Sequence, residues 1–118
     1  MAKVIIHVFH GDVDSLSAGS HVAERVRQVA GDQAVDLEVF CFGPAQEALS
    51  DRSDASTLTQ YNQQVDDLIK AGVPVGACRN SAEAAGTEQT LTDRGIQLQY
   101  ARDAFVRFAL EGATVINF

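Results

Sequence analysis

Apolar runs and helical stripes alternate along the chain. Short runs rich in β-branched or aromatic residues predict five strands, over residues 3–9, 35–42, 73–77, 96–100 and 113–118. Apolar residues spaced three and four positions apart predict the longer helices, over residues 14–30, 56–72 and 102–111. Shorter helices are expected over residues 45–49 and 80–86. Strands alternating with helices indicate right-handed crossovers, so the predicted fold is α/β: a three-layer α/β/α sandwich around a five-stranded, mostly parallel sheet, a variant of the flavodoxin-like arrangement.

The predicted strands differ in how they should be covered. The continuous apolar run over residues 4–6 is typical of a central strand buried on both faces. Residues 96–100 alternate between apolar and polar, which predicts an edge strand or one with a solvent-exposed face. Residues 87–94 show no decisive pattern, and the polar stretch over residues 50–54 predicts a surface loop.

Length and composition fit one domain over residues 1–118. A chain of 118 residues with 46% hydrophobic residues can bury a core without disulfides or a metal. Two cysteines are too few for a secreted disulfide scaffold, which favours a reducing, cytoplasmic location. No stretch approaches the roughly 18 apolar residues that span a bilayer, so no membrane association is expected.

The charge balance narrows the possible partners. Nine basic and 16 acidic residues give a formal net charge of −7. This sign opposes the phosphate backbone, and no cluster of Lys and Arg offsets it. Nucleic acid is therefore not expected as a partner.

The segment around Cys78 is the strongest candidate for chemistry. Cys78 stands between a predicted strand and a predicted helix, where Asn80 and Glu83 resemble a capping box and Gly86 ends the helix. Main-chain N–H groups and the helix dipole favour negative charge at such a junction. A thiol there, beside Arg79, should have a lowered pKa and be nucleophilic. The alternative is a buried structural cysteine that acts as a small hydrophobe.

Loops after the first three predicted strands supply further candidate binding residues: His10, Gly11, Asp12, Gly43, Pro44, Arg79, Asn80 and Ser81. The carboxyl ends of parallel strands share one sheet edge, so these loops are expected to converge on one crevice. His10 could move a proton or orient an anion, or be a plain surface histidine. Gly11 and Gly43 could allow a close approach of the backbone or simply form turns.

Metal binding and redox pairing receive less support. Asp12 and Asp14 have no further ligands in a metal-binding pattern, so helix capping explains them and no metal site is expected. Asp14 or Ser15 is expected to cap the first helix. Cys41 lies in an apolar run, which favours structural burial. A pair with Cys78 stays open, because strand order decides whether their Cα atoms come within about 7 Å.

Two segments carry a family resemblance. Residues 72–81 (GVPVGACRNS), the later Gly86 and the closing residues 112–116 (GATVI) resemble the DsrE/DsrF-like proteins. The short first strand, the Asp-containing loop and the Gly-Pro after the second strand are similar as well, so the resemblance covers nearly the whole chain. It implies a small α/β/α domain that assembles into trimers or hexamers. It also implies that Cys78 corresponds to the cysteine that carries a persulfide in sulfur-relay members and passes its sulfane sulfur to a partner protein.

Three functions are compatible with these residues. The leading hypothesis is an intracellular persulfide carrier or sulfurtransferase-like subunit that needs sulfur donor and acceptor proteins and no cofactor. The second is a ligand-binding module without turnover, in which His10, Gly43 and Asn80 hold a small anion or nucleotide. The third is an assembly subunit with Val106 and Phe118 in a subunit contact. Whether the chain is an enzyme stays open at this point.

Overall fold

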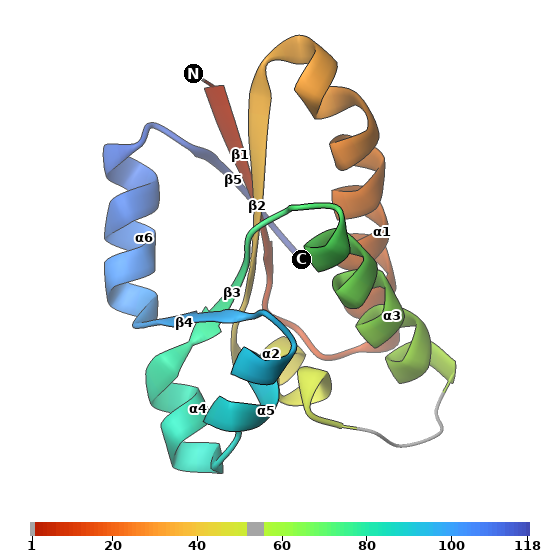
Figure 1. The fold of residues 1–118 in the computed structure, drawn as a ribbon, viewed down its shortest axis with the longest axis vertical. Coiled ribbons are helices and arrows are strands. Elements are labelled where there is room, and N and C mark those ends of the chain that lie inside the picture. Colours follow the sequence, from red (N-terminus) through yellow and green to blue (C-terminus); the bar gives the residue numbers. More distant parts are fainter. Residues whose placement is uncertain (1, 52–55) are drawn as a thin grey trace.

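The computed structural model describes residues 2–51 and 56–118 and confirms the predicted α/β architecture (Figure 1). Its five-stranded sheet has the order β4-β3-β2-β1-β5, and all neighbouring strands are parallel. The strands are β1 (Ala2–Val8), β2 (Val35–Cys41), β3 (Val75–Cys78), β4 (Gln97–Gln99) and β5 (Thr114–Asn117). The helices are α1 (Val13–Ala30), η1 (Gly31–Gln33, a 3-10 turn), α2 (Gly43–Leu49), α3 (Ser56–Lys70), α4 (Arg79–Ala85), α5 (Glu88–Asp93) and α6 (Ala101–Leu110).

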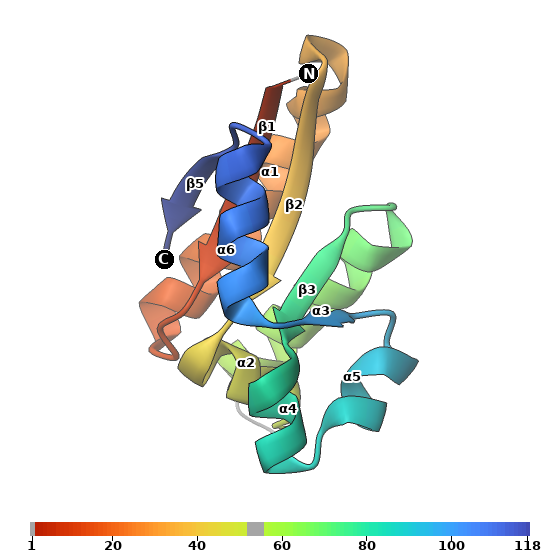
Figure 2. The ribbon, with the colours of Figure 1, turned by 90° about the vertical axis from the view of Figure 1, so that its left-hand side faces the viewer.

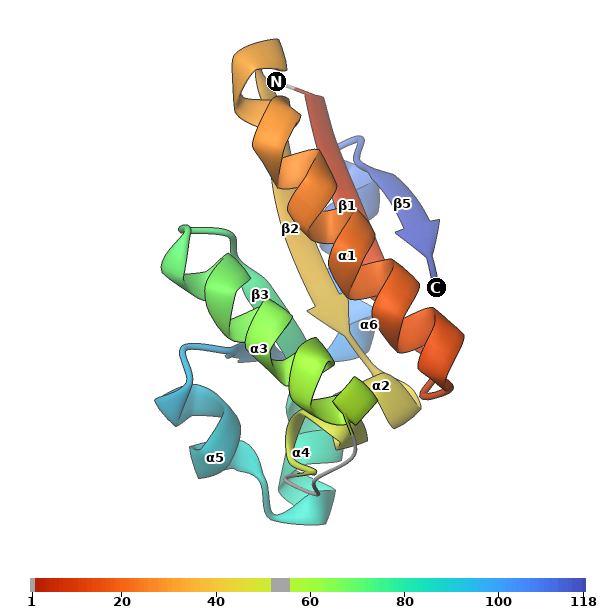
Figure 3. The ribbon, with the colours of Figure 1, turned by 90° about the vertical axis from the view of Figure 1, so that its right-hand side faces the viewer.

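The helices are arranged as two layers and a group at one end of the sheet. Helices α1 and α3 cover one face, α6 covers the other, and α2, α4 and α5 lie beyond the carboxyl ends of the strands (Figures 1 and 3). The chain steps across the sheet from β1 to β4, and α6 then leads back to β5 beside β1. A right-handed crossover in this reverse direction must run over the opposite face, which explains why α6 lies on that side.

The central strands are buried on both faces, as the apolar run in β1 predicts. Ile6 and its register partner Val39 belong to the larger core cluster, under α1 and α3. Ile5 and Phe40 point the other way, into a smaller cluster with Phe108 of α6. Side chains therefore alternate between two cores along each central strand, and this alternation decides which side chains can meet near Cys78.

The cap of the first helix differs from the prediction. Asp12 occupies the N-cap position, and its carboxylate accepts a hydrogen bond from the Ser15 N–H at 3.0 Å. The expectation that Asp14 or Ser15 caps this helix was wrong, because α1 begins earlier and places both residues inside its first turn. The Asp12 carboxylate therefore has a structural role, which is the capping explanation favoured for the acidic pair.

The predicted capping box after Cys78 is also wrong. Strand β3 extends through Cys78, which is the register partner of Gln99 in β4, so Cys78 itself takes the N-cap position of α4. Asn80 then lies inside the first turn and cannot cap the helix. Gly86 does end α4, with a φ of 70° in the left-handed region, as predicted.

The remaining differences are small. The ambiguous residues 87–94 contain the short helix α5, and the alternating segment 96–100 contributes only the three-residue edge strand β4. The loop predicted over residues 50–54 lies largely outside the described residues. Within the described parts of the chain, no helix is long and apolar enough to cross a membrane.

Candidate functional site

Cys78 lies at the end of β3, where the helices that follow β3 and its neighbour β4 pack on opposite faces of the sheet. After β3 the chain enters α4, whose Ala82 packs into the larger core cluster. After β4 it enters α6, whose Ala104 and Phe108 pack into the cluster on the other face. Figure 2 shows α4 and α6 leaving the adjacent ends of β3 and β4 in different directions. In open α/β sheets a crevice forms at such a switch point and commonly binds the ligand.

A pocket opens at this switch point and reaches Cys78. Its volume is about 470 Å³, and it is lined by Phe42, Cys78, Asn80, Tyr100, Ala101 and Arg102. The Cys78 residue as a whole is only 4% exposed, because strands and helices cover most of its surface. A cysteine that is nearly buried yet lines an open pocket can meet a ligand in the pocket while its main chain stays fixed.

The surroundings of the Cys78 sulfur favour the thiolate. Burial raises the pKa of the Cys78 thiol, but hydrogen bonds to the sulfur together outweigh burial, so the net shift is downward. The donors are the main-chain N–H and the hydroxyl of Ser81 and the main-chain N–H groups of Ala101 and Asn80. These residues lie in the first turns of α4 and α6, so the amino ends of two helices face one sulfur. The nucleophilic form is therefore more populated near neutral pH than in an ordinary cysteine.

The three residues that follow Cys78 have different surroundings. Asn80 lines the Cys78 pocket. Ser81 lines a neighbouring pocket of about 190 Å³ and also donates to the sulfur. Arg79, which follows the thiol in sequence and was considered as a charge beside it, forms an ion pair with Glu88 of α5 at 3.9 Å. The donors to the sulfur named above are main-chain amides and a hydroxyl.

The other predicted loop residues do not share this pocket. Gly11 and Pro44 line a pocket of about 460 Å³ beside α1, and Gly43 lines the smaller pocket with Ser81. His10 and Asp12 are exposed. The main-chain N–H of His10 donates to the main-chain oxygen of Phe118 at 3.2 Å. The expected single crevice is therefore divided. Helix α2 starts directly after β2, and its Glu47 lines both the pocket that contains Gly11 and the pocket that contains Ser81.

The two glycines of these loops serve packing. A Cβ atom on Gly11 would lie 2.8 Å from Cβ of Pro44, and one on Gly43 would overlap the ring of Phe9. Gly43 also has a φ of 58°, which favours glycine. Both glycines thus bring the β1 and β2 loops against each other, which is the plain turn and packing role.

Sequence reasoning missed several residues around Cys78. Tyr100, Ala101 and Arg102 follow β4, and Gln46 lies on α2 with hydrogen bonds to the Cys78 main chain. The alternating strand followed at once by a helical stripe was a usable signal for a helix N-terminus after β4. That signal points to Cys78 only when β3 and β4 are known to be neighbours.

A family model matches almost the whole chain, including the residues of this junction. The model of the DsrE/DsrF-like family matches residues 3–118. The chain belongs to this family. No curated protein matches the chain significantly.

Solved structures share the fold of this DsrE/DsrF-like chain. The protein of unknown function BT1422 from Bacteroides thetaiotaomicron has a TM-score of 0.78 at 14% identity, covering 98% of this chain and 94% of its own. The protein of unknown function MTH1491 from Methanobacterium thermoautotrophicum has a TM-score of 0.72 at 24% identity, with 100% of both chains covered. The ychN protein from E. coli has a TM-score of 0.71 at 18% identity, again with 100% of both chains covered. At these identities the likeness shows the fold.

The second cysteine of this DsrE/DsrF-like chain is structural. Cys41 is fully buried, and burial raises the pKa of its thiol to about 11. The Tyr61 hydroxyl donates to its sulfur at 3.3 Å. Cys41 is the register partner of Ala77, so the next residue, Cys78, points to the opposite face of the sheet. The pair left open by the sequence is not formed, and both cysteines are free thiols.

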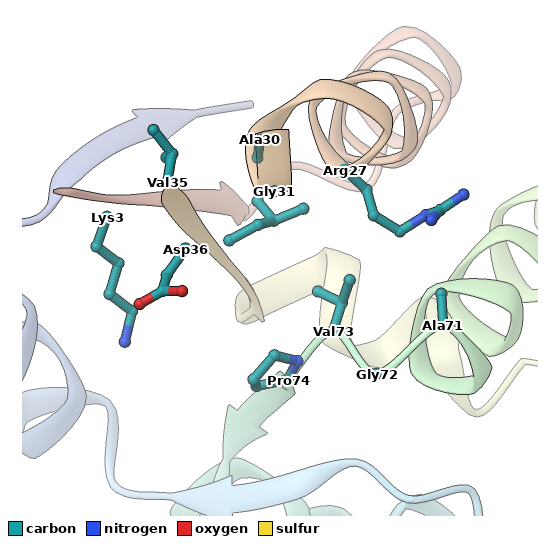
Figure 4. Close-up of a pocket in the computed structure, with 11 residues that line it drawn as sticks. Lys3, Arg27, Ala30, Gly31, Val35, Asp36, Ala71, Gly72, Val73 and Pro74 are labelled. Carbon is teal, nitrogen blue, oxygen red and sulfur yellow. The ribbon is translucent and has the colours of Figure 1, made fainter. Parts of the chain in front are cut away.

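A larger pocket lies at the other end of the sheet. It measures about 540 Å³ and lies between the end of α1, the start of β2 and the turn before β3 (Figure 4). Its cationic side chains already have partners: Lys3 contacts Glu111 at 2.7 Å, and Arg27 bonds with Glu24 of its own helix. Ligand sites of parallel sheets lie at the carboxyl ends of the strands, so the Cys78 pocket remains the better candidate.

Proposed function

We propose that this DsrE/DsrF-like protein is an intracellular sulfur carrier or sulfurtransferase-like subunit that holds a persulfide on Cys78. The observation that supports this is the setting of one sulfur atom. Cys78 lines an open pocket at the switch point of the sheet, and hydrogen-bond donors from α4 and α6 lower the pKa of its thiol. A nucleophilic thiolate with room in front of it is what sulfur transfer requires.

The loading step needs a donor that carries sulfane sulfur, such as a persulfide R–S–SH. The Cys78 thiolate attacks the outer sulfur of the donor, a new S–S bond forms on Cys78, and the bond between R–S and the outer sulfur breaks. The electron pair leaves with R–S⁻ and the proton stays on the transferred sulfur, which gives Cys78–S–SH. No external oxidant or reductant is consumed.

The unloading step reverses the roles. A thiolate of an acceptor protein attacks the outer sulfur, and the Cys78 thiolate leaves with the electron pair. The amides of Asn80, Ser81 and Ala101 that stabilise the resting thiolate would equally stabilise the leaving thiolate. Donor and acceptor would meet Cys78 through the same open pocket, in a reducing compartment such as the cytoplasm, where free thiols persist.

Intact-mass spectrometry tests this proposal. After incubation with a persulfide donor and removal of excess reagent, the wild type should gain the mass of one sulfur atom. Cys78→Ser should gain none, because the nucleophile is gone. Cys41→Ser is the matched control and should load like the wild type, since the Cys41 thiol is buried with a pKa of about 11. Equal loading of Cys78→Ser and wild type, or no loading of the wild type, would contradict the proposal.

Self-assembly into a trimer or hexamer is part of the proposal. Val106 and Leu110 lie one helical turn apart on α6 and are 59% and 84% exposed. Large apolar side chains exposed next to each other on one helix are common at subunit contacts. Phe118, the other residue considered for a contact, is partly buried against the larger core cluster.

Sedimentation of two charge variants tests the assembly. We expect the wild type to sediment as a trimer or hexamer at micromolar concentration and Leu110→Glu to shift it towards monomer, because a carboxylate would be buried in the contact. Val29→Glu is the matched control, since Val29 of α1 is 60% exposed on the other side of the sheet and should leave the mass unchanged. A monomeric wild type would overturn the proposed assembly.

A further inference from the structure

The main chain of Cys78 is held by a buried side chain from another helix. Gln46 of α2 is 4% exposed. Its amide nitrogen donates to the Cys78 carbonyl oxygen at 2.9 Å, and its amide oxygen accepts from the Cys78 N–H, also at 2.9 Å. One carboxamide therefore satisfies both main-chain polar groups of the cysteine.

Gln46 takes the place of a β2 residue opposite Cys78, because β2 ends one position too early to supply one. The ladder between β2 and β3 ends with the pair Cys41 and Ala77, because the chain then turns from β2 into α2. On this side Cys78 has no strand residue opposite it, and its buried N–H would lack a partner. The Gln46 carboxamide offers a donor and an acceptor side by side, as a residue of a neighbouring strand would.

We propose that Gln46 is a positioning residue that fixes the Cys78 main chain so that its sulfur faces the amides at the starts of α4 and α6. The relevance of this inference to sulfur transfer rests on the proposed function. Gln46 bonds to both main-chain groups of Cys78 on one side, and β4 pairs with the strand on the other side, where Gln99 is the register partner of Cys78. The direction in which the Cys78 side chain leaves the main chain is therefore fixed. Hydrogen bonds to an anion depend steeply on alignment, so a small rotation of Cys78 would weaken them.

Two variants separate positioning from plain structural support. Gln46→Met keeps the volume and removes both hydrogen bonds, and Gln46→Leu removes both with a second uncharged side chain, so neither variant adds a charge near the thiol. We expect the thiolate absorbance of Cys78 to appear at higher pH in both. We also expect its alkylation rate at pH 7 to fall about tenfold in Gln46→Met, the loss that corresponds to one hydrogen bond to an ionised group.

Asn62→Leu is the matched control. Asn62 of α3 is also a 4% exposed carboxamide that bonds to the main chain of α2, through the Ala48 oxygen at 3.0 Å, but it does not contact Cys78. The Asn62→Leu variant should have a lower melting temperature than the wild type, while its Cys78 thiol should titrate at the same pH as in the wild type. If the Gln46 variants lower only the melting temperature and titrate like wild type, the positioning role is overturned.

The two proposals fail separately. Thiol titration and alkylation need no sulfur donor, so they test Gln46 even if the wild type takes up no sulfane sulfur, a result that would remove the proposed function alone. Sulfur uptake by a wild type whose Gln46 variants titrate normally would leave the carrier function in place and remove the positioning role.

Discussion

Replacing Arg94 with methionine should lower the free energy of unfolding by about 3 kcal/mol, and the melting temperature by roughly 10 °C. The Arg94 side chain is only 9% exposed and bonds to Asp66 of α3 at 2.9 and 3.0 Å. It also donates to the Leu49 carbonyl oxygen at 2.6 Å and to the Asn62 amide oxygen at 2.9 Å. One guanidinium thus joins the end of α5 to both α2 and α3.

The large effect comes from what the substitution leaves behind. Methionine fills most of the volume but donates no hydrogen bond, so the Leu49 carbonyl and the Asn62 amide lose a buried donor and Asp66 loses its cation. Unpaired buried polar groups are among the few causes of losses of this size.

Urea unfolding at pH 7 measures the loss. Arg102→Met is the matched control, because the Arg102 side chain is 83% exposed and its contacts, with Asp103 and with the ring of Tyr100, are to exposed residues. We expect the control to unfold at the wild-type urea concentration. If Arg94→Met also unfolds there, the bonds of Arg94 make no net contribution to stability.

The second large effect concerns the charge network between α6 and the sheet. Replacing Arg107 with methionine should lower the free energy of unfolding at pH 7 by about 2 kcal/mol, a figure reduced for the partial exposure of Arg107. The Glu38 side chain is 6% exposed on β2, and Arg107 bonds to both of its oxygens, at 3.1 and 2.7 Å. Lys3 remains as its second cation at 2.9 Å.

The loss should depend on pH. Burial raises the pKa of Glu38, but the hydrogen bonds and charges of Arg107 and Lys3 outweigh burial and lower it. A carboxylate with a lowered pKa stabilises the fold above its unfolded pKa, and this stabilisation disappears as pH falls through the folded value. The gap between wild type and Arg107→Met should therefore be widest at neutral pH and should narrow in acid, as the pH falls through the lowered pKa of Glu38 and its carboxylate is protonated.

Unfolding curves of both proteins across this pH range check the prediction. Arg27→Met provides the control, since Arg27 pairs with Glu24 on the surface of a single helix and its loss should change the unfolding midpoint little. A gap between wild type and Arg107→Met that stays constant down to acid pH would show that the substitution acts through packing rather than through the Glu38 carboxylate.

Much of the fold could be predicted because local patterns of apolar and polar residues indicate where the strands and helices lie. The apolar run in β1, the alternation in β4 and the helical stripes each reflect burial that the neighbouring residues already encode. The position of Cys78 at a junction of strand and helix was visible for the same reason. The exact start of α4 was not, because the extra residue of β3 depends on pairing with β4.

The surroundings of Cys78 could not be predicted in the same way. Tyr100 and Ala101 reach the pocket only because β4 lies beside β3, and strand order is not encoded in any local pattern. The two hydrogen bonds from Gln46 to the Cys78 main chain depend on where α2 packs after β2 ends, and a single glutamine in a short helix gives no sequence signal. The expected crevice of three loops was divided by that same helix.

The most direct test is to locate the transferred sulfur. Wild-type protein exposed to a persulfide donor would be alkylated, digested and mapped by tandem mass spectrometry. The account predicts the added sulfur on the peptide that carries Cys78, with Cys41 unmodified while the protein is folded. Added sulfur on Cys41, or a Cys78 peptide that stays unmodified and resists alkylation until the protein unfolds, would contradict it.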